Sequence, residues 1–209
     1  DGYNVAVGFQ AGHLMTTGTE NTIMGGLAGD ALTTGARNVA IGYHALGGED
    51  AHGKNVAIGY QALKAQDAGA DAYNVAIGYS AGENISTGVQ NVLMGGKAGD
   101  ALTTGGYNVA IGHEALSAED GHGKNVAIGW QALSDQNAGA DAFNIGIGYN
   151  AGKAMTTGIR NVIMGGLAGD ALNTGSNNIA IGYEALTTED GNGRNIAIGT
   201  NSLQNLNAG

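Results

Sequence analysis

The sequence predicts an all-β protein built as one parallel β-solenoid, or β-roll, of 12 coils. Asparagine recurs along the chain at spacings of 17, 17, 17 and 19 residues, and this set of spacings repeats. A glycine stands four residues after every one of these asparagines, and the three residues between them are almost all apolar. A fixed short period of this kind is typical of a solenoid, in which each coil stacks only on its neighbours. The recurring asparagines are Asn4, Asn21, Asn38, Asn55, Asn74, Asn91, Asn108, Asn125, Asn144, Asn161, Asn178 and Asn195.

Composition supports this fold class and excludes several others. Glycine accounts for 40 of 209 residues, and proline and cysteine are absent. Interior glycines cost a helix about 1 kcal/mol each, so long helices are not expected. The net charge of −10 argues against a nucleic-acid partner, which would require a basic surface. No apolar run is long enough to insert into a membrane, and without cysteine there is no disulfide framework.

Each coil is expected to contribute one short strand, as in Asn38-Val39-Ala40-Ile41-Gly42. Val39 and Ile41 share one face because side chains alternate in a strand, and we expect that face to line the core. The middle residue, Ala40, then faces outward although it is apolar. A strand apolar on both faces is usually covered on both, and a second copy of the chain is the simplest cover. The middle residues expected to pack between chains are Ala6, Ile23, Ala40, Ala57, Ala76, Leu93, Ala110, Ala127, Ile163, Ala180 and Ala197.

The asparagine and glycine columns have a structural explanation. Stacked asparagines can form hydrogen bonds along the solenoid or hold a turn. The glycine suits a bend with positive φ or a close approach of two backbones. We therefore expect a structural ladder made by the twelve asparagines and by glycines that include Gly8, Gly42, Gly78, Gly112, Gly148 and Gly182.

Four coils form a set of 70 residues, so the single segment 1–209 divides into near-copies at 1–70, 71–140 and 141–209. Without distinct capping coils, the segment is expected to belong to a longer array. The two extra residues of each fourth coil predict a longer loop at 65–72 and at 135–142. Such a loop either carries surface contacts or is simply a solvated turn. The candidate surface-contact residues are Asp67, Asp71, Asp135 and Asp141.

Two positions within the coil exchange large and small residues. In the first two coils of each set, the eighth residue after the asparagine is glycine and the eleventh is large, as in Gly29 and Leu32. In the last two coils the eighth is leucine and the eleventh is polar, as in Leu46 and Glu49, although the twelfth coil departs from this rule. Such an exchange is typical of densely packed neighbouring sites.

The acidic turns at 49–50, 119–120 and 189–190 are the strongest candidates for a metal site. Together with Asp67 or Asp71, such a turn could supply carboxylates to calcium. A solvated acidic face is the preferred interpretation, because charge runs usually are solvated. His52 and His122 lie four coils apart and cannot bind one ion within a chain. No catalytic, cofactor-binding or metal-binding residue is therefore predicted.

Two remote functions fit parts of the sequence. Residues 41–46 match the six-residue unit of left-handed β-helix acyltransferases, but only one unit fits in each coil. Paired threonines, as at 33–34 and 103–104, suggest an ice-binding surface. Acidic and alanine residues interrupt that column in the third and fourth coils, whereas a regular surface needs every coil.

The Asn-Val-Ala-Ile-Gly unit resembles the repeats in the head of YadA-like trimeric autotransporter adhesins. The longer pattern of residues 33–43 is also similar to repeats in bacteriophage tail-fibre proteins. The resemblance implies three β-rolls around one axis and a role in attachment. The coils here are longer than those of the adhesin heads, and no neck or membrane anchor is present in the sequence.

These observations favour a non-enzymatic homotrimer without a cofactor, forming a shaft or head segment of a phage tail fibre. The alternative is the head of a bacterial surface adhesin. Either function places the chain outside the cell, on a virion or on a bacterial surface. The expected partners are further copies of the chain and a receptor or glycan on a host surface.

Overall fold

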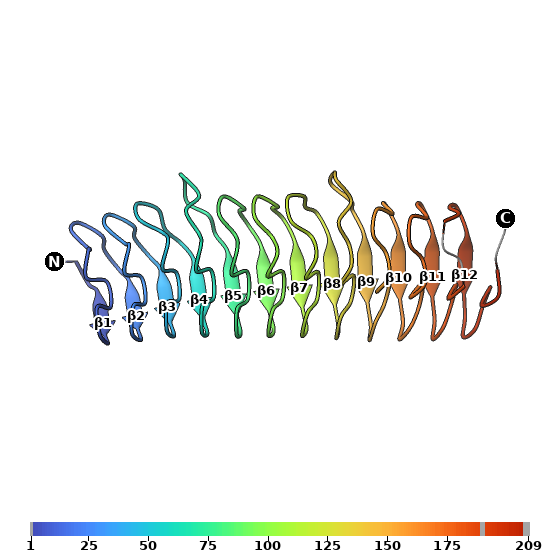
Figure 1. Ribbon diagram of the computed structural model, residues 1–209, viewed down its shortest axis with the longest axis horizontal. Helices are drawn as coiled ribbons and strands as arrows, with labels where there is room; N and C mark the ends of the chain where they lie inside the picture. The colour runs from blue at the N-terminus through green and yellow to red at the C-terminus, as the bar shows by residue number, and fades with distance from the viewer. Residues whose placement is uncertain (1, 189–190, 207–209) are drawn as a thin grey trace.

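The computed structural model describes residues 2–188 and 191–206. Its 12 strands form one parallel sheet in chain order, which extends along a rod (Figure 1). The all-β parallel solenoid predicted from the sequence is therefore confirmed. The strands are β1 Val5–Val7, β2 Thr22–Met24, β3 Val39–Ile41, β4 Val56–Ile58, β5 Val75–Ile77, β6 Val92–Met94, β7 Val109–Ile111, β8 Val126–Ile128, β9 Ile145–Ile147, β10 Val162–Met164, β11 Ile179–Ile181 and β12 Ile196–Ile198.

The strands pair in perfect register along the rod. Val39 pairs with Val56 and Ala40 with Ala57, so equivalent residues of successive coils lie side by side. The register is kept across the longer fourth coil, where Val56 pairs with Val75. The two extra residues are therefore absorbed outside the sheet, in loops that rise above the others beside β4 and β8 (Figure 1).

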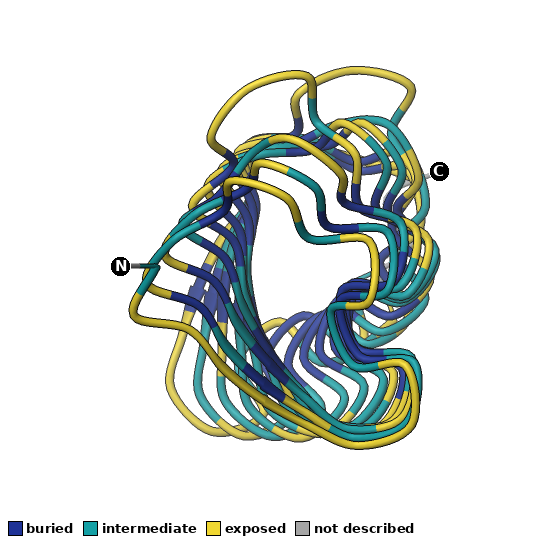
Figure 2. Cartoon of the chain, turned by 90° about the vertical axis from the view of Figure 1, so that its left-hand side faces the viewer, coloured by how far each residue is buried: buried dark blue, intermediate teal, exposed yellow. Residues whose placement is uncertain are grey.

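The strands face the opposite way from the prediction. The middle residue points into the core of its own chain, and Ala40 has no exposed surface, whereas Val39 and Ile41 are half-buried on the outside. Viewed along the rod, the buried positions line the inside of the coil (Figure 2). Fully or almost fully buried in the same way are Ile23, Ala57, Ala76, Leu93, Ala110, Ala127, Ile163, Ala180 and Ala197.

These middle residues consequently offer no surface to a second chain, and their expected role between chains is corrected. Only Ala6, in the first coil, is exposed. Alternation fixes which residues share a face but not which face is inward. Larger middle residues such as Ile23 pack beside a glycine at the eighth position, as at Gly29. At most other middle positions, large side chains from the opposite wall leave room for little more than a methyl group, and this narrow core decides the direction. At Gly146, for instance, even an added Cβ would lie 2.6 Å from the Leu133 side chain.

The exchange between the eighth and eleventh positions reflects one core space that either position can fill. An added Cβ at Gly29 would lie 2.8 Å from the Leu32 side chain, so the glycine makes room for that leucine. In the third coil Leu46 is the buried side chain at position eight. Leu46 has a φ of 52°, a left-handed conformation that costs a non-glycine residue roughly 1–2 kcal/mol. Burial of the leucine side chain is large enough to offset this cost.

The asparagine column forms the predicted ladder by an asymmetric bond. The Asn91 Oδ1 accepts a hydrogen bond from the backbone N–H of Asn108 at 2.9 Å, and the equivalent bond joins all eleven successive pairs at 2.8–3.1 Å. The Asn91 Nδ2 donates to the Gly105 carbonyl, fourteen residues further on, at 2.9 Å. Asn91 thus binds two backbone groups that the sheet itself leaves free, whereas Asn55 and Asn125, beside the longer loops, keep only the bond through Oδ1.

The glycine that follows each strand from β1 to β11 is required for two reasons. Gly112 has a φ of 137°, and an added Cβ would lie 2.2 Å from the Gly129 carbonyl oxygen in the next coil. No side chain fits between backbones that approach so closely. The same two conditions hold at Gly8, Gly42, Gly78, Gly148 and Gly182.

Candidate functional site

The outward side of the sheet is an apolar surface, which we call the strand face. It consists of the first and third residues of each strand, such as Val109 and Ile111 of β7. In the inner strands these side chains are half-buried within one chain, except that the third position is exposed in β2, β6 and β10, where it is methionine. In the end strands β1 and β12 both outward positions are exposed. The sequence-based argument that a strand apolar on both sides needs two covers still holds, but the side that lacks a cover is the Val/Ile side.

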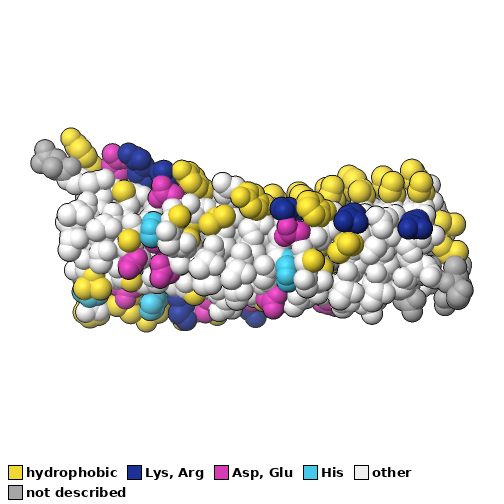
Figure 3. All heavy atoms as spheres, turned by 90° about the horizontal axis from the view of Figure 1, so that it is seen from above, with side chains coloured by type: hydrophobic (Ala, Val, Ile, Leu, Met, Phe, Trp, Pro, Cys, Tyr) yellow, Lys and Arg dark blue, Asp and Glu magenta, His cyan; other side chains and the backbone are white. Residues whose placement is uncertain are grey.

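Aromatic side chains border the strand face. The residue after the bend glycine carries rings that stack along the rod, with centroids 5.5 Å apart for Tyr43 and Tyr60 and 5.3 Å for Tyr60 and Tyr79. Farther along, His113 stacks on Trp130 at 4.4 Å. Figure 3 shows hydrophobic side chains gathered along one long edge of the rod. The exposed aromatic residues at this position are Phe9, Tyr43, Tyr60, Tyr79, Trp130, Tyr149 and Tyr183.

The four aspartates predicted as surface contacts are all exposed, at or beside the longer loops. Asp71 is partly engaged, since it accepts a hydrogen bond from the Gly53 N–H at 3.1 Å and forms an ion pair with Lys54 at 2.6 Å. The hydrogen bond from Lys54 lowers the pKa of Asp71. Asp141 repeats this arrangement with Lys124. Asp67 and Asp135 form no ion pair with the described residues.

The acidic turns are expected from the sequence to form a solvated face, but the glutamate of each described turn is buried. Glu49 is completely buried, and its Oε1 accepts a hydrogen bond from the His52 N–H at 3.0 Å. Burial raises the pKa of Glu49, and the hydrogen bond from His52 opposes that shift. Glu119 and His122 repeat the arrangement at 3.1 Å, again with a raised pKa at the glutamate. The third acidic turn, at 189–190, lies outside the described residues.

Each of these turns gathers more than one potential ligand atom. Glu49, Asp50, His52 and Asp67 each place one within 4.8 Å of the others, and Glu119, Asp120 and His122 do the same. Asp71, the alternative to Asp67 in the sequence-based hypothesis, is held by Lys54 instead. The two histidines lie in separate turns, as their spacing predicts.

The exchange of large and small residues between the eighth and eleventh positions of the coil already indicates that the glutamates are buried. Position eleven holds Leu32 in one coil and Glu49 in the next coil. A position that supplies a core leucine in one coil points inward in the others too. The polar residues around Glu49 predict a solvated turn, and this prediction is wrong for the Glu49 side chain, which is buried.

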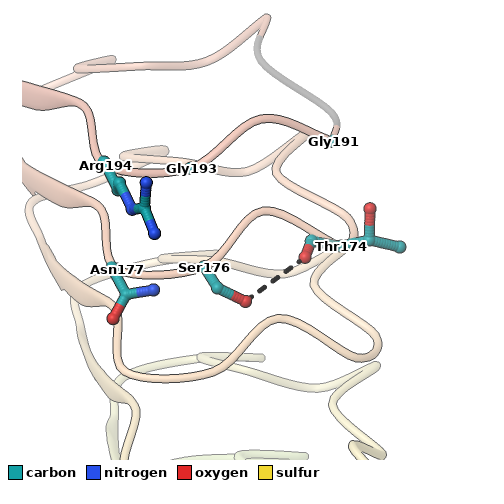
Figure 4. A pocket seen from close by; sticks show the side chains of 6 residues that line it. All are labelled: Thr174, Ser176, Asn177, Gly191, Gly193 and Arg194. Atoms are coloured by element: carbon teal, nitrogen blue, oxygen red, sulfur yellow. Dashed lines mark hydrogen bonds between the residues drawn. The ribbon is translucent and has the colours of Figure 1, made fainter.

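A depression near the C-terminal end offers little for chemistry. A surface pocket of 330 Å³ is lined by Thr174, Ser176, Asn177, Gly191, Gly193 and Arg194 (Figure 4). The Ser176 hydroxyl donates to the Thr174 carbonyl at 3.5 Å. The lining side chains include no carboxylate, histidine or cysteine that could activate this hydroxyl.

No family model, curated protein or solved structure matches the chain. Over the described residues, no helix has the length and hydrophobicity that crossing a membrane requires. The functional argument therefore depends on the rod, its strand face and its turns.

Proposed function

We propose that this chain is a structural, non-enzymatic rod segment of an extracellular attachment fibre, and that it assembles as a homotrimer through the strand face. The observation that carries the proposal is the apolar surface along the outside of the sheet, in which Thr22 of β2 is the one polar strand residue among the described strands. Elsewhere on the rod the exposed large hydrophobic side chains, such as Tyr73, Tyr107 and Phe143, are interspersed with charged and polar residues.

The size of the strand face supports a buried interface. Three strand residues span roughly 10 Å, and twelve strands spaced about 4.8 Å apart extend over roughly 53 Å. The resulting area of roughly 500 Å², to which the aromatic column adds, is as large as the largest apolar patch on a typical monomer, and such patches are often functional. It approaches the roughly 800 Å² per partner of a standard protein interface.

The internal bonding of the rod suits a mechanical role. A ladder of eleven asparagine-to-backbone hydrogen bonds runs beside the sheet, inside the coil. Every coil is thus joined to the next by both backbone and side-chain bonds. A fibre that must transmit force over a distance needs this kind of continuous connection.

Contact with a host receptor or glycan is assigned to the protruding loops. Asp67 stands exposed on the first longer loop and Asp135 on the second, and loops on a rigid scaffold commonly carry binding. A phage tail fibre is the preferred origin, and a bacterial adhesin head is the alternative. The flanking sequence distinguishes them, since a chaperone domain favours a fibre and a coiled-coil stalk with a membrane anchor favours an adhesin.

Light scattering coupled to size-exclusion chromatography tests the assembly. With a chain mass of 20.7 kDa, the trimer has three times that mass, 62.1 kDa, at every protein concentration tested. Replacing Ile77 and Ile111 on the strand face by glutamate should give monomers, because six buried carboxylates would lie at the interface. The control Thr104→Glu changes an exposed turn and should remain trimeric.

A wild-type chain that stays monomeric at all concentrations contradicts the trimer. A flat solid such as ice then becomes the partner to test. A trimer that survives both glutamate substitutions places the interface elsewhere on the rod.

A further inference from the structure

The turn that follows β3 combines buried and exposed ligand atoms. Glu49, Asp50 and His52 come from the third coil of the first set, and Asp67 comes from the fourth. The arrangement recurs 70 residues later at Glu119, Asp120 and His122. In Figure 3, histidine and acidic side chains lie together at more than one place along the rod. A recurring arrangement in which a buried carboxylate adjoins a histidine is unusual for a solvated turn.

The glutamate of this turn is only half satisfied. Its side chain has no exposed surface, and while Oε1 accepts the His52 N–H, the buried Oε2 has no hydrogen-bond partner among the described residues. Glu119 shows the same unpaired Oε2. Leaving such an atom unpaired costs roughly 1–3 kcal/mol, and more when it is charged. The same unpaired carboxylate oxygen at both turns points to a bound group that this oxygen would contact.

The histidine of each turn also has an unpaired polar atom, its ring nitrogen Nδ1. The His52 Nδ1 lies 3.6 Å from the Glu49 Oε1, and the His122 Nδ1 lies 3.4 Å from the Glu119 Oε1. Both nitrogens are enclosed and have no hydrogen-bond partner among the described residues. An ion pair between the two side chains would partner the histidine but would leave Oε2 of the glutamate unpaired. A metal cation satisfies the carboxylate and the imidazole together.

We propose that Glu49, Asp50, His52 and Asp67 bind a divalent transition-metal ion, with Zn²⁺ as the best fit. Imidazole and carboxylate are both zinc ligands, whereas calcium requires six to eight oxygens. Ligand atoms around zinc lie about 3.3 Å apart, given bond lengths of about 2.0–2.1 Å. Exposed Asp50 and Asp67 can close the present spread of up to 4.8 Å by rotating their side chains toward the fixed Glu49.

The bound ion links two successive coils. Asp67 lies at the start of the longer loop, so coordination joins that loop to the turn of the coil before it. Glu119, Asp120 and His122 form the second site, in which Asn137 stands where the first set has Asp67. The second site therefore has one carboxylate fewer and binds zinc more weakly. The proposal does not depend on the trimer, because all the ligands come from one chain.

The sequence itself supplies substitutions suited to the test. The third set has Asn192 at the position of His52, and the second set has Asn137 at the position of Asp67. His52→Asn and Asp67→Asn therefore introduce residues that equivalent coils already contain. Asp71→Asn is the matched control, since Asp71 is nearby and acidic but bound to Lys54.

Isothermal titration of the chelator-treated full chain with ZnCl₂, alongside thermal unfolding, tests the proposal. We expect two zinc ions per chain, with the first site at least about tenfold tighter, as loss of even a supporting metal-site residue costs 10–100-fold. Asp67→Asn should bring the two affinities together, and His52→Asn should remove the tighter site, while Asp71→Asn binds like the wild type. Zinc should raise the melting temperature of the wild type and of Asp71→Asn.

Two results would overturn the proposal. One is the absence of saturable zinc binding to the wild type at micromolar concentrations, which leaves an internal ion pair as the role of the cluster. The other is unchanged binding in the chain carrying both His52→Asn and His122→Asn, because the remaining histidines would then account for it. Visible absorption of Co²⁺ bound to the wild type gives a readout that needs no variant. Four protein ligands predict tetrahedral coordination, so a spectrum without tetrahedral bands contradicts the proposed site.

Discussion

Removing a single asparagine from the ladder should destabilise the rod by an amount that depends on which coil loses it. In Asn91→Ala, the buried N–H of Asn108 loses the oxygen to which it is bonded at 2.9 Å. The buried carbonyl of Gly105 also loses its donor, which lies 2.9 Å away. Each buried group left unpaired costs about 1–3 kcal/mol, so the total loss should be about 2–6 kcal/mol.

Asn125→Ala is the matched comparison within the same column. The Asn125 Oδ1 accepts from the Asn144 N–H at 3.1 Å, but its buried Nδ2 has no partner among the described residues. The carbonyl fourteen residues further on, that of Gly139, belongs to the longer loop. The same truncation therefore leaves one group unpaired instead of two and should cost about 1–3 kcal/mol.

Urea denaturation followed by circular dichroism, at one fixed protein concentration, measures both changes. The two variants remove identical atoms from equivalent buried positions, so side-chain volume cancels in the comparison. Asn91→Ala should lower the free energy of unfolding about twice as much as Asn125→Ala. Equal losses, or a larger loss for Asn125→Ala, would refute the view that the bonds of the amide group stabilise the ladder.

Four further substitutions test the packing and the electrostatics. Gly112→Ala should prevent folding or lower the melting temperature drastically, because its Cβ would lie 2.2 Å from a backbone oxygen. Gly139→Ala also has positive φ but open space around it, so it should cost only about 1–2 kcal/mol by the same thermal assay. Leu102→Ala empties the core space of its coil and should cost about 2–5 kcal/mol in urea denaturation, with a smaller loss contradicting tight packing there. Burial raises the folded-state pKa of Asp100 above its ordinary value of 3.8, so the native state binds this proton more readily than the unfolded chain. The stabilisation that the protonated Asp100 gives the folded state is therefore fully present below pH 3.8. This stabilisation is lost as the pH rises through the folded-state pKa. Asp100→Asn should consequently gain stability relative to the wild type between pH 4 and pH 7, and a constant difference across that range would contradict the assignment.

The sequence by itself determined the repeating architecture. The period of asparagine and glycine requires one coil for each repeat, because residues such as Asn91 and Asn108 can bond to each other only when they stack. The glycine column likewise predicts the close approach of backbones that is observed at Gly112. These features are local and recur twelve times, so pattern alone reveals them.

The tertiary structure decided which side of each strand faces inward. Alternation places Val39 and Ile41 together but is symmetric between the two faces. The choice depends on the width of the coil, which is set by leucines on the opposite wall such as Leu46. Glu49 is likewise buried beside His52 and not solvated, because the backbone at its position directs the side chain into the coil. Core width depends on residues distant in the sequence, and this is why the direction of the strand face and the burial of Glu49 could be established only from the tertiary structure.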